Sequence, residues 1–149
     1  MLGLPYNLSG MIVERGFIMN SLSSSLEDYL EIICNYTNSS KKVRAIDISR
    51  KLNVSRASTT EALKKLADKK LINYGRYDAI SLTESGKEIA ETIISKHSVL
   101  QNFFEKVLKL DTEEASYNAC KIEHIITNNA YEKIVEYLNK QESPSNENS

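Results

Sequence analysis

Apolar residues recur at helical spacing directly after a serine-rich stretch that ends at Ser25. Positions 26, 29, 30 and 33 are all Leu, Tyr or Ile, which places an apolar stripe on one face of a helix predicted over 26–36. Ser25 followed by Asp28 predicts a capping box at the start of this helix. Cys34 lies within the helix, where an isolated cysteine is usually a core residue, so we expect it in the core.

Two short helices come next, predicted over 44–53 and 57–70 from their apolar spacing. A tight turn separates them, and Ser55 is placed to cap the second. The second helix begins Ser-Arg-Ala-Ser-Thr-Thr, a run of short hydrogen-bonding side chains with one arginine. Two helices joined in this way are typical of a helix-turn-helix, in which the second helix reads DNA.

Two short runs of β-forming residues follow, over 71–74 and 79–82. The segment between them, Gly75-Arg76-Tyr77-Asp78, contains a glycine and an arginine. It predicts the turn of a hairpin with a basic tip. We call this hairpin, residues 71–82, the wing, and the pattern from 22 to 85 therefore predicts a winged helix-turn-helix DNA-binding domain.

The rest of the chain shows mainly helical spacing. Thr83 is placed to cap a long helix predicted over 84–108, and further helices are predicted over 113–127 and 130–140. The fold class is therefore predicted to be mainly α, with a helical domain over 86–140 after the winged domain. We treat 1–21 as an uncertain or disordered N-terminal extension, and 141–149 has the polar composition of a disordered tail.

Composition restricts the class of protein. The 149 residues, 41% hydrophobic and 26% charged, are typical of a soluble globular chain of one domain or two small ones. No apolar run approaches the roughly 18–20 residues that cross a bilayer, so we expect no membrane association. Two cysteines cannot build a disulfide framework, which favours the cytoplasm.

Charge is distributed unevenly, although the net charge is only −1. The segment 41–87 contains 12 basic and 5 acidic residues and so has a net charge of +7, whereas the rest of the chain has −8. A segment of this kind favours contact with a polyanion. A Lys-rich solvated surface, or a winged helix that binds protein, is the plainer interpretation of the charge alone.

The candidate DNA contacts are of two kinds. Short polar side chains and an arginine at the start of the second helix reach base edges and phosphates, and basic side chains further out meet the DNA backbone. Glu61 is the exception, because phosphate repels its carboxylate, which could only accept from a cytosine amino group. The predicted contacts are Lys42, Arg44, Ser55, Arg56, Ser58, Thr59, Thr60, Lys64 and Arg76.

Metal-ligating residue types also occur at helical spacing. Cys120, Glu123 and His124 stand at i, i+3 and i+4 on one face of a predicted helix. Asp28 and Glu31 share a face of the first helix, and His97 lies within the long one. Together they could bind a metal ion, but each group also has a plainer interpretation, as a core cysteine, as helix-start acids or as a surface pair.

Five motifs carry a resemblance to a known family. They are Leu26-Glu-Asp-Tyr-Leu-Glu31, Val54-Ser-Arg-Ala-Ser-Thr-Thr, Leu82-Thr-Glu-Ser-Gly-Lys87, Lys96-His97 and Ala119-Cys-Lys-Ile-Glu-His124. With them the chain resembles the iron- and manganese-dependent repressors of the diphtheria toxin repressor family. The resemblance implies a winged helix-turn-helix followed by a helical metal-binding and dimerisation domain. It also implies six metal ligands, namely Asp28, Glu31, His97, Cys120, Glu123 and His124.

The chain departs from both main branches of that family. Cys120 stands where the manganese branch has a glutamate, and Asp28 stands where the iron branch has a methionine. Gln101 and Ser116 stand where the iron branch usually has further ligands. The nine residues after Lys140 leave no room for a third domain, so we expect the short two-domain form, similar to the manganese transport regulators.

The resemblance implies a metal-dependent repressor rather than an enzyme. We expect a homodimer that binds palindromic double-stranded DNA, controls metal homeostasis and takes no small-molecule substrate. A thiolate among carboxylates and imidazole favours Fe(II), with Mn(II) close behind, as one or two ions per chain. The alternative functions are a winged-helix regulator that senses an organic ligand or oxidation of Cys120, and an iron-dependent oxygenase or hydrolase.

Overall fold

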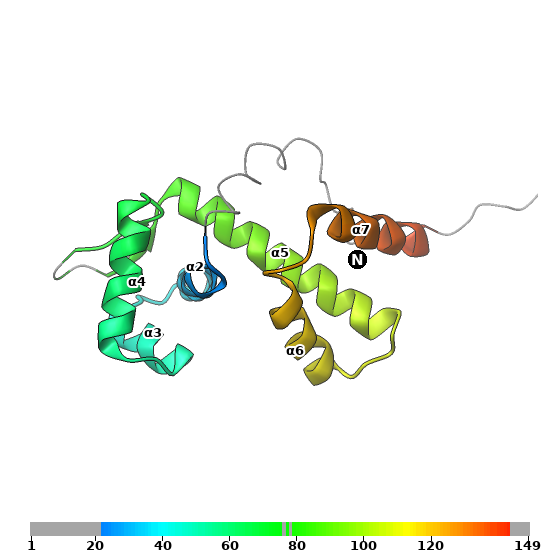
Figure 1. The fold of residues 1–149 in the computed structure, drawn as a ribbon, viewed down its shortest axis with the longest axis horizontal. Helices are drawn as coiled ribbons and strands as arrows, with labels where there is room; N and C mark the ends of the chain where they lie inside the picture. The colour runs from blue at the N-terminus through cyan, green and yellow to red at the C-terminus, as the bar shows by residue number, and fades with distance from the viewer. Residues whose placement is uncertain (1–21, 76, 78, 144–149) are drawn as a thin grey trace, which may run out of the picture. The chain divides into compact units, whose positions relative to one another are not determined.

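The computed structural model describes residues 22–75, 77 and 79–143. The predicted N-terminal extension, Arg76 and residues 144–149 of the predicted tail lie outside the described residues. The described residues divide into two compact units, 22–94 and 95–143, which we call the N-terminal and C-terminal units. The fold is mainly α, as predicted, and Figure 1 shows its helices along the chain.

Helix α2 (Ser24–Asn38) lies in the core of the N-terminal unit. It begins earlier than predicted, because the hydroxyl of Ser23, not Ser25, caps it by accepting from the backbone N–H of Leu26 at 3.3 Å. Neighbouring serines are equally able to cap a helix. The buried side chain of Leu22, 8% exposed, joins the core just before the cap and is consistent with the earlier start.

The helix-turn-helix forms as predicted. Helix α3 (Ala45–Leu52) ends at Asn53, whose left-handed φ of 53° turns the chain. Ser55 caps helix α4 (Arg56–Asp68), and its hydroxyl accepts from the N–H of Ser58 at 3.1 Å. Helix α4 ends two residues before the predicted position, and Lys70 follows with a positive φ of 58°.

The wing is an antiparallel hairpin of strands β1 (Ile72–Asn73) and β2 (Ser81–Leu82). Its strands are shorter than the predicted runs, but Ile80 extends the pairing by a bridge to Val43, just before α3. This bridge ties the base of the wing to the helix-turn-helix. The winged helix-turn-helix prediction is therefore confirmed for the described residues.

Helix α5 (Glu84–Lys106) belongs to both units. The hydroxyl of Thr83 accepts from the N–H of Gly86 at 3.1 Å and so caps its start, as predicted. Ile89, Ala90 and Ile93 of its first half lie in the N-terminal core. For this reason the units divide at residue 94, within α5, whereas the predicted domain boundary lies at the start of that helix.

The C-terminal unit contains the second half of α5, helix α6 (Thr112–Ile122) and helix α7 (Asn128–Glu142). Its core consists of Val99, Tyr131, Val135 and Leu138. The predicted helix over 113–127 was too long, because Thr127 instead caps α7 by accepting from Ala130 N–H at 3.3 Å. Helix α7 runs two residues into the predicted tail. None of the described helices combines the length and apolar character needed to cross a bilayer.

Candidate metal centre and DNA-binding surface

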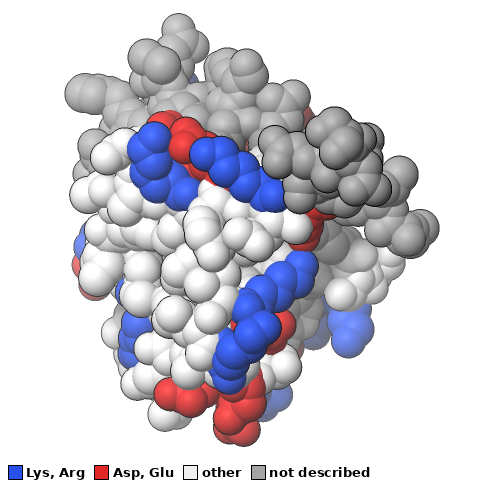
Figure 2. Space-filling model, turned by 90° about the vertical axis from the view of Figure 1, so that its right-hand side faces the viewer, with Lys and Arg blue, Asp and Glu red and all other residues white. Residues whose placement is uncertain are grey.

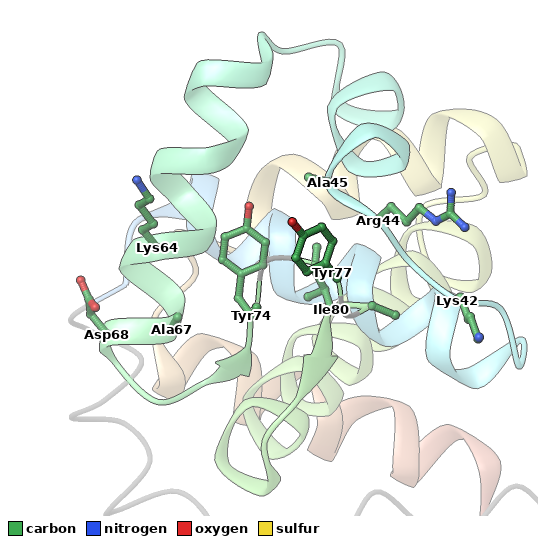
Figure 3. Close-up of a pocket in the computed structure, with 11 residues that line it drawn as sticks. Lys42, Arg44, Ala45, Lys64, Ala67, Asp68, Tyr74, Tyr77 and Ile80 are labelled. Carbon is green, nitrogen blue, oxygen red and sulfur yellow. The ribbon is translucent and has the colours of Figure 1, made fainter.

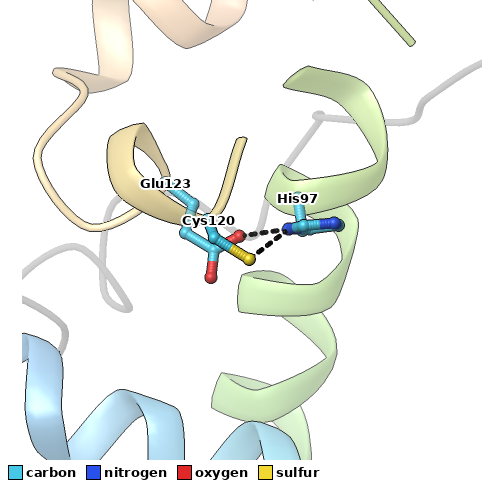
Figure 4. Close-up of side chains that lie close together, drawn as sticks. All are labelled: His97, Cys120 and Glu123. Atoms are coloured by element: carbon cyan, nitrogen blue, oxygen red, sulfur yellow. Dashed lines mark hydrogen bonds and ion pairs between the residues drawn. The ribbon is translucent and has the colours of Figure 1, made fainter. Parts of the chain in front are cut away.

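Three side chains of the C-terminal unit bring potential metal-ligand atoms together (Figure 4). His97 comes from α5, Cys120 from α6, and Glu123 from the residue that ends α6. The His97 Nδ1 atom lies 2.8 Å from Glu123 Oε2 and 3.6 Å from Cys120 Sγ. One ligand atom from each residue lies within 4.8 Å of those of the other two. We call these three residues the His97 cluster.

The backbone at the end of α6 sets the spacing of the cluster. Glu123 lies just beyond the last helical residue but keeps helical dihedrals, φ −54° and ψ −31°, and its N–H donates to Ala119 at 2.9 Å. Cys120 and Glu123 therefore share a face as residues three apart on a helix do. Ala115 and Ala119 are fully buried, and their small side chains let this stretch of α6 pack closely.

Glu123 is the buried member of the cluster, with its side chain only 1% exposed. A buried carboxylate is costly unless charges or hydrogen bonds compensate it. Two imidazoles lie near it: His97 Nδ1 at 2.8 Å from Oε2, and His124 Nε2 at 3.5 Å from Oε1. His124 therefore lies beside the same carboxylate, and both side chains are largely buried.

His97 is oriented by a contact on its other side. Its Nε2 atom lies 3.4 Å from the hydroxyl oxygen of Ser116, one turn before Cys120 on α6. With a metal ion bound, an Nε2–H proton donated to Ser116 would leave the Nδ1 lone pair for the ion, and a second hydrogen bond of this kind commonly fixes a metal-ligating histidine. In the sequence, Ser116 stands out only as a departure from the iron branch, so its contact with His97 was not predicted.

The donor set fits a first-row transition ion. A thiolate, an imidazole and a carboxylate suit borderline metals such as Fe(II), Mn(II), Co(II) and Zn(II). Of the six predicted ligands, the structure brings His97, Cys120 and Glu123 together and adds His124 through Glu123. Asp28 and Glu31 lie on α2, in the N-terminal unit, and their role as ligands stays a prediction.

Most of the predicted DNA contacts are exposed. The side chains that solvent reaches freely are those of Lys42, Arg44, Ser55, Arg56, Ser58 and Lys64, and Thr60 is half-buried. Thr59 is different: it is fully buried, and its hydroxyl donates to the carbonyl oxygen of Ser55 at 3.0 Å. Thr59 is thus a core residue of α4 and cannot reach DNA, because the helix turns it away from solvent.

A groove of about 770 Å³ lies between α4 and the wing (Figure 3). Its basic lining residues are Lys42, Arg44 and Lys64. Tyr74 and Tyr77 also line it, and neither was among the predicted contacts, although Tyr77 lies within the predicted turn and Tyr74 directly precedes it. Basic and acidic side chains are mixed on the face seen in Figure 2, with a broad uncharged area between them.

Two family models match adjacent parts of the chain. The model described as the iron dependent repressor N-terminal DNA binding domain matches residues 21–80. The model described as the iron dependent repressor metal binding and dimerisation domain matches residues 83–148, which include the whole His97 cluster.

Individual proteins agree with these matches. An uncharacterised helix-turn-helix transcriptional regulator of Methanocaldococcus jannaschii is 33% identical over 120 residues, 80% of this chain and 96% of that protein. The transcriptional regulator MntR of Oceanobacillus iheyensis is 31% identical over 115 residues, 77% of this chain and 78% of MntR. The structure of the manganese regulator SloR is similar to this one, with a TM-score of 0.69 and 27% sequence identity. The match covers 76% of this chain but only 53% of the SloR chain, so this chain spans about half the length of SloR. The chain therefore belongs to the diphtheria toxin repressor family of metal-dependent transcriptional repressors.

Proposed function

We propose that this repressor binds its operator as a homodimer only when Fe(II) or Mn(II) is held at the His97 cluster. The observation that carries the proposal is the convergence of three ligand atoms within 4.8 Å of one another, in the unit matched by the metal-binding and dimerisation model. Ser116 supports it, because its contact with His97 Nε2 turns Nδ1 toward the other two donors.

The proposed ligand set extends beyond the cluster. His124, beside Glu123, and the α2 carboxylates of Asp28 and Glu31 complete it in line with the family resemblance. Because the thiolate of Cys120 is a soft ligand, we propose Fe(II) ahead of Mn(II), as one or two ions per chain. When bound, an ion supplies positive charge and fixed coordination directions, and ligands from both units would restrain their relative motion.

The proposed DNA contacts lie on the exposed start of α4 and around the groove beside the wing. In a twofold dimer, two α4 helices read half-sites about 34 Å apart, or a multiple of that distance, on palindromic DNA. The helix start contributes backbone N–H groups and the serine hydroxyls, and Arg56 adds a charge for phosphate or guanine. The phosphates of the DNA backbone are contacted by Lys42, Arg44 and Lys64.

The decisive experiment is a DNA-binding titration under anaerobic conditions. Duplexes selected from a random library by the metal-loaded protein serve as the operator. We expect Mn(II), and at lower concentration Fe(II), to increase the DNA affinity, with Co(II) and Zn(II) for comparison and a chelated sample as the control. If the affinity is the same with chelator, the metal requirement is wrong and regulation by an organic ligand or thiol oxidation becomes the better proposal.

A further inference from the structure

Glu61 is an acid on the outward face of the helix that is proposed to read DNA. The buried face of α4 consists of Thr59, Ala62, Leu63 and Leu66. Glu61 follows Thr59 by two residues, a turn of about 200° around a helix, so it points directly away from this core. Its side chain is 68% exposed.

A carboxylate at this position is unfavourable for non-specific DNA binding, because the phosphates repel it. Lys65, one turn further along α4, offsets the repulsion: its Nζ atom lies 2.8 Å from Glu61 Oε1. This hydrogen bond, together with the lysine charge, lowers the pKa of Glu61, so the carboxylate stays ionised at neutral pH. An ionised carboxylate accepts about four hydrogen bonds, and the contact with Lys65 leaves acceptor sites for a further donor.

The chemistry of the major groove selects that donor. An ionised carboxylate only accepts, and the amino groups exposed there are N4 of cytosine and N6 of adenine. Adenine also presents N7, an acceptor next to its amino group, which repels the second carboxylate oxygen. Cytosine has no such neighbour on its own edge. The carboxylate therefore favours cytosine.

We infer that Glu61 is a specificity-determining residue that accepts a hydrogen bond from a cytosine amino group in each half-site. The inference rests on the proposed DNA-binding function and adds the base that the operator must carry opposite the middle of the exposed α4 face. Lys65 acts as a positioning residue that holds the carboxylate and offsets its charge.

The test is a selection of binding sites from a random duplex library in the presence of Mn(II). The unchanged protein should enrich a motif with cytosine at one position of each half-site, at about tenfold discrimination. Glu61→Gln should move that preference to adenine, because glutamine pairs with adenine N6 and N7, and leave the other positions as they were. Glu61→Ala should lose the preference at that position alone.

Glu91→Gln is the matched control. Glu91 forms the equivalent i, i+4 pair with Lys87, at 4.0 Å, on α5 rather than on the reading helix, and its variant should select the original motif. The inference is overturned if Glu61→Gln keeps cytosine, or if its preferences weaken equally at all positions. If the unchanged protein enriches no site at all with metal, the proposed function itself fails.

Discussion

The two cysteines of this chain have opposite surroundings. Cys34 is 1% exposed in the N-terminal core, as its position within an amphipathic helix predicted, whereas Cys120 is exposed beside His97. Burial, followed by the charge of Glu91, raises the pKa of the Cys34 thiol above its usual value. Cys34 is therefore a neutral packing residue, and Cys120 is the thiol that a reagent in solution can reach.

A thiol reagent should distinguish them. In the folded, metal-free protein at pH 7–8, one thiol per chain should react quickly, and mass spectrometry should locate it at Cys120. Cys34 should react only in denaturant, because it is buried and because its raised pKa reduces the reactive thiolate fraction at this pH. Equal labelling rates at both positions would contradict the assignment.

Replacing the two cysteines should separate metal binding from packing. Cys120→Ala should remove metal-dependent DNA binding while the chain stays folded, because the variant loses one of three converging donors at an exposed position. Cys34→Ala is the control: it should lower the stability by about 1 kcal/mol through a small cavity and keep the metal response. Gel shifts across a metal titration, with circular dichroism for folding, measure both effects. A full metal response in Cys120→Ala would remove this thiol from the site.

Residue spacing predicted part of the metal centre and could not predict the rest. The i, i+3 relation of Cys120 and Glu123 follows from helix geometry, and the structure places these two side chains together; their role as metal ligands stays a prediction. The placement of Ser116 against His97 depends on how two helices pack, which spacing within either helix does not contain. The burial of Thr59 could have been predicted from the sequence, because Thr59 shares a helix face with Ala62, Leu63 and Leu66.

At the scale of elements, the types of helix and strand were predicted well and their ends less so. Two adjacent candidate caps, such as Ser23 and Ser25, have similar local preferences, and the tertiary environment decides between them. The same holds at the end of α6, where the cap of the next helix at Thr127 competes with continuation of the helix. The predictions were therefore wrong mainly at the ends of helices, although they gave the right order of elements.

Gly86 joins α5 to the wing and should tolerate no side chain. An added Cβ would lie 1.8 Å from the carbonyl oxygen of Leu71, a backbone atom that cannot move alone. Gly86→Ala should therefore lower the free energy of unfolding by about 1–3 kcal/mol, the usual cost of overpacking. Ser85→Ala, at an exposed position in the same turn, should change it by less than about 0.5 kcal/mol.

Urea unfolding followed by circular dichroism compares the two variants. An unchanged midpoint for Gly86→Ala would mean that the start of α5 can move away from Leu71 at little cost.

At the scale of the whole molecule, the excess of basic residues falls in segment 41–87, which contains the proposed DNA contacts. Arg56→Ala removes an exposed cation at the first position of α4. We expect weaker DNA binding at every metal concentration and a log–log salt dependence that is shallower by about 1, because one phosphate contact is lost. Lys133→Ala, an exposed cation on α7, should leave both quantities unchanged. Fluorescence anisotropy at several salt concentrations gives both quantities, and an unaltered salt slope in Arg56→Ala would exclude a phosphate contact there.

Helix α5 contributes to the cores of both units, and the division between them falls inside it. Proteases cut most readily in exposed, irregular segments whose backbone can open locally. At residues 94 and 95 the backbone is instead helical, and the neighbouring Lys96 is only 9% exposed. Brief trypsin digestion should accordingly release no stable half of this protein, because a cut between the units would have to open the middle of a continuous helix.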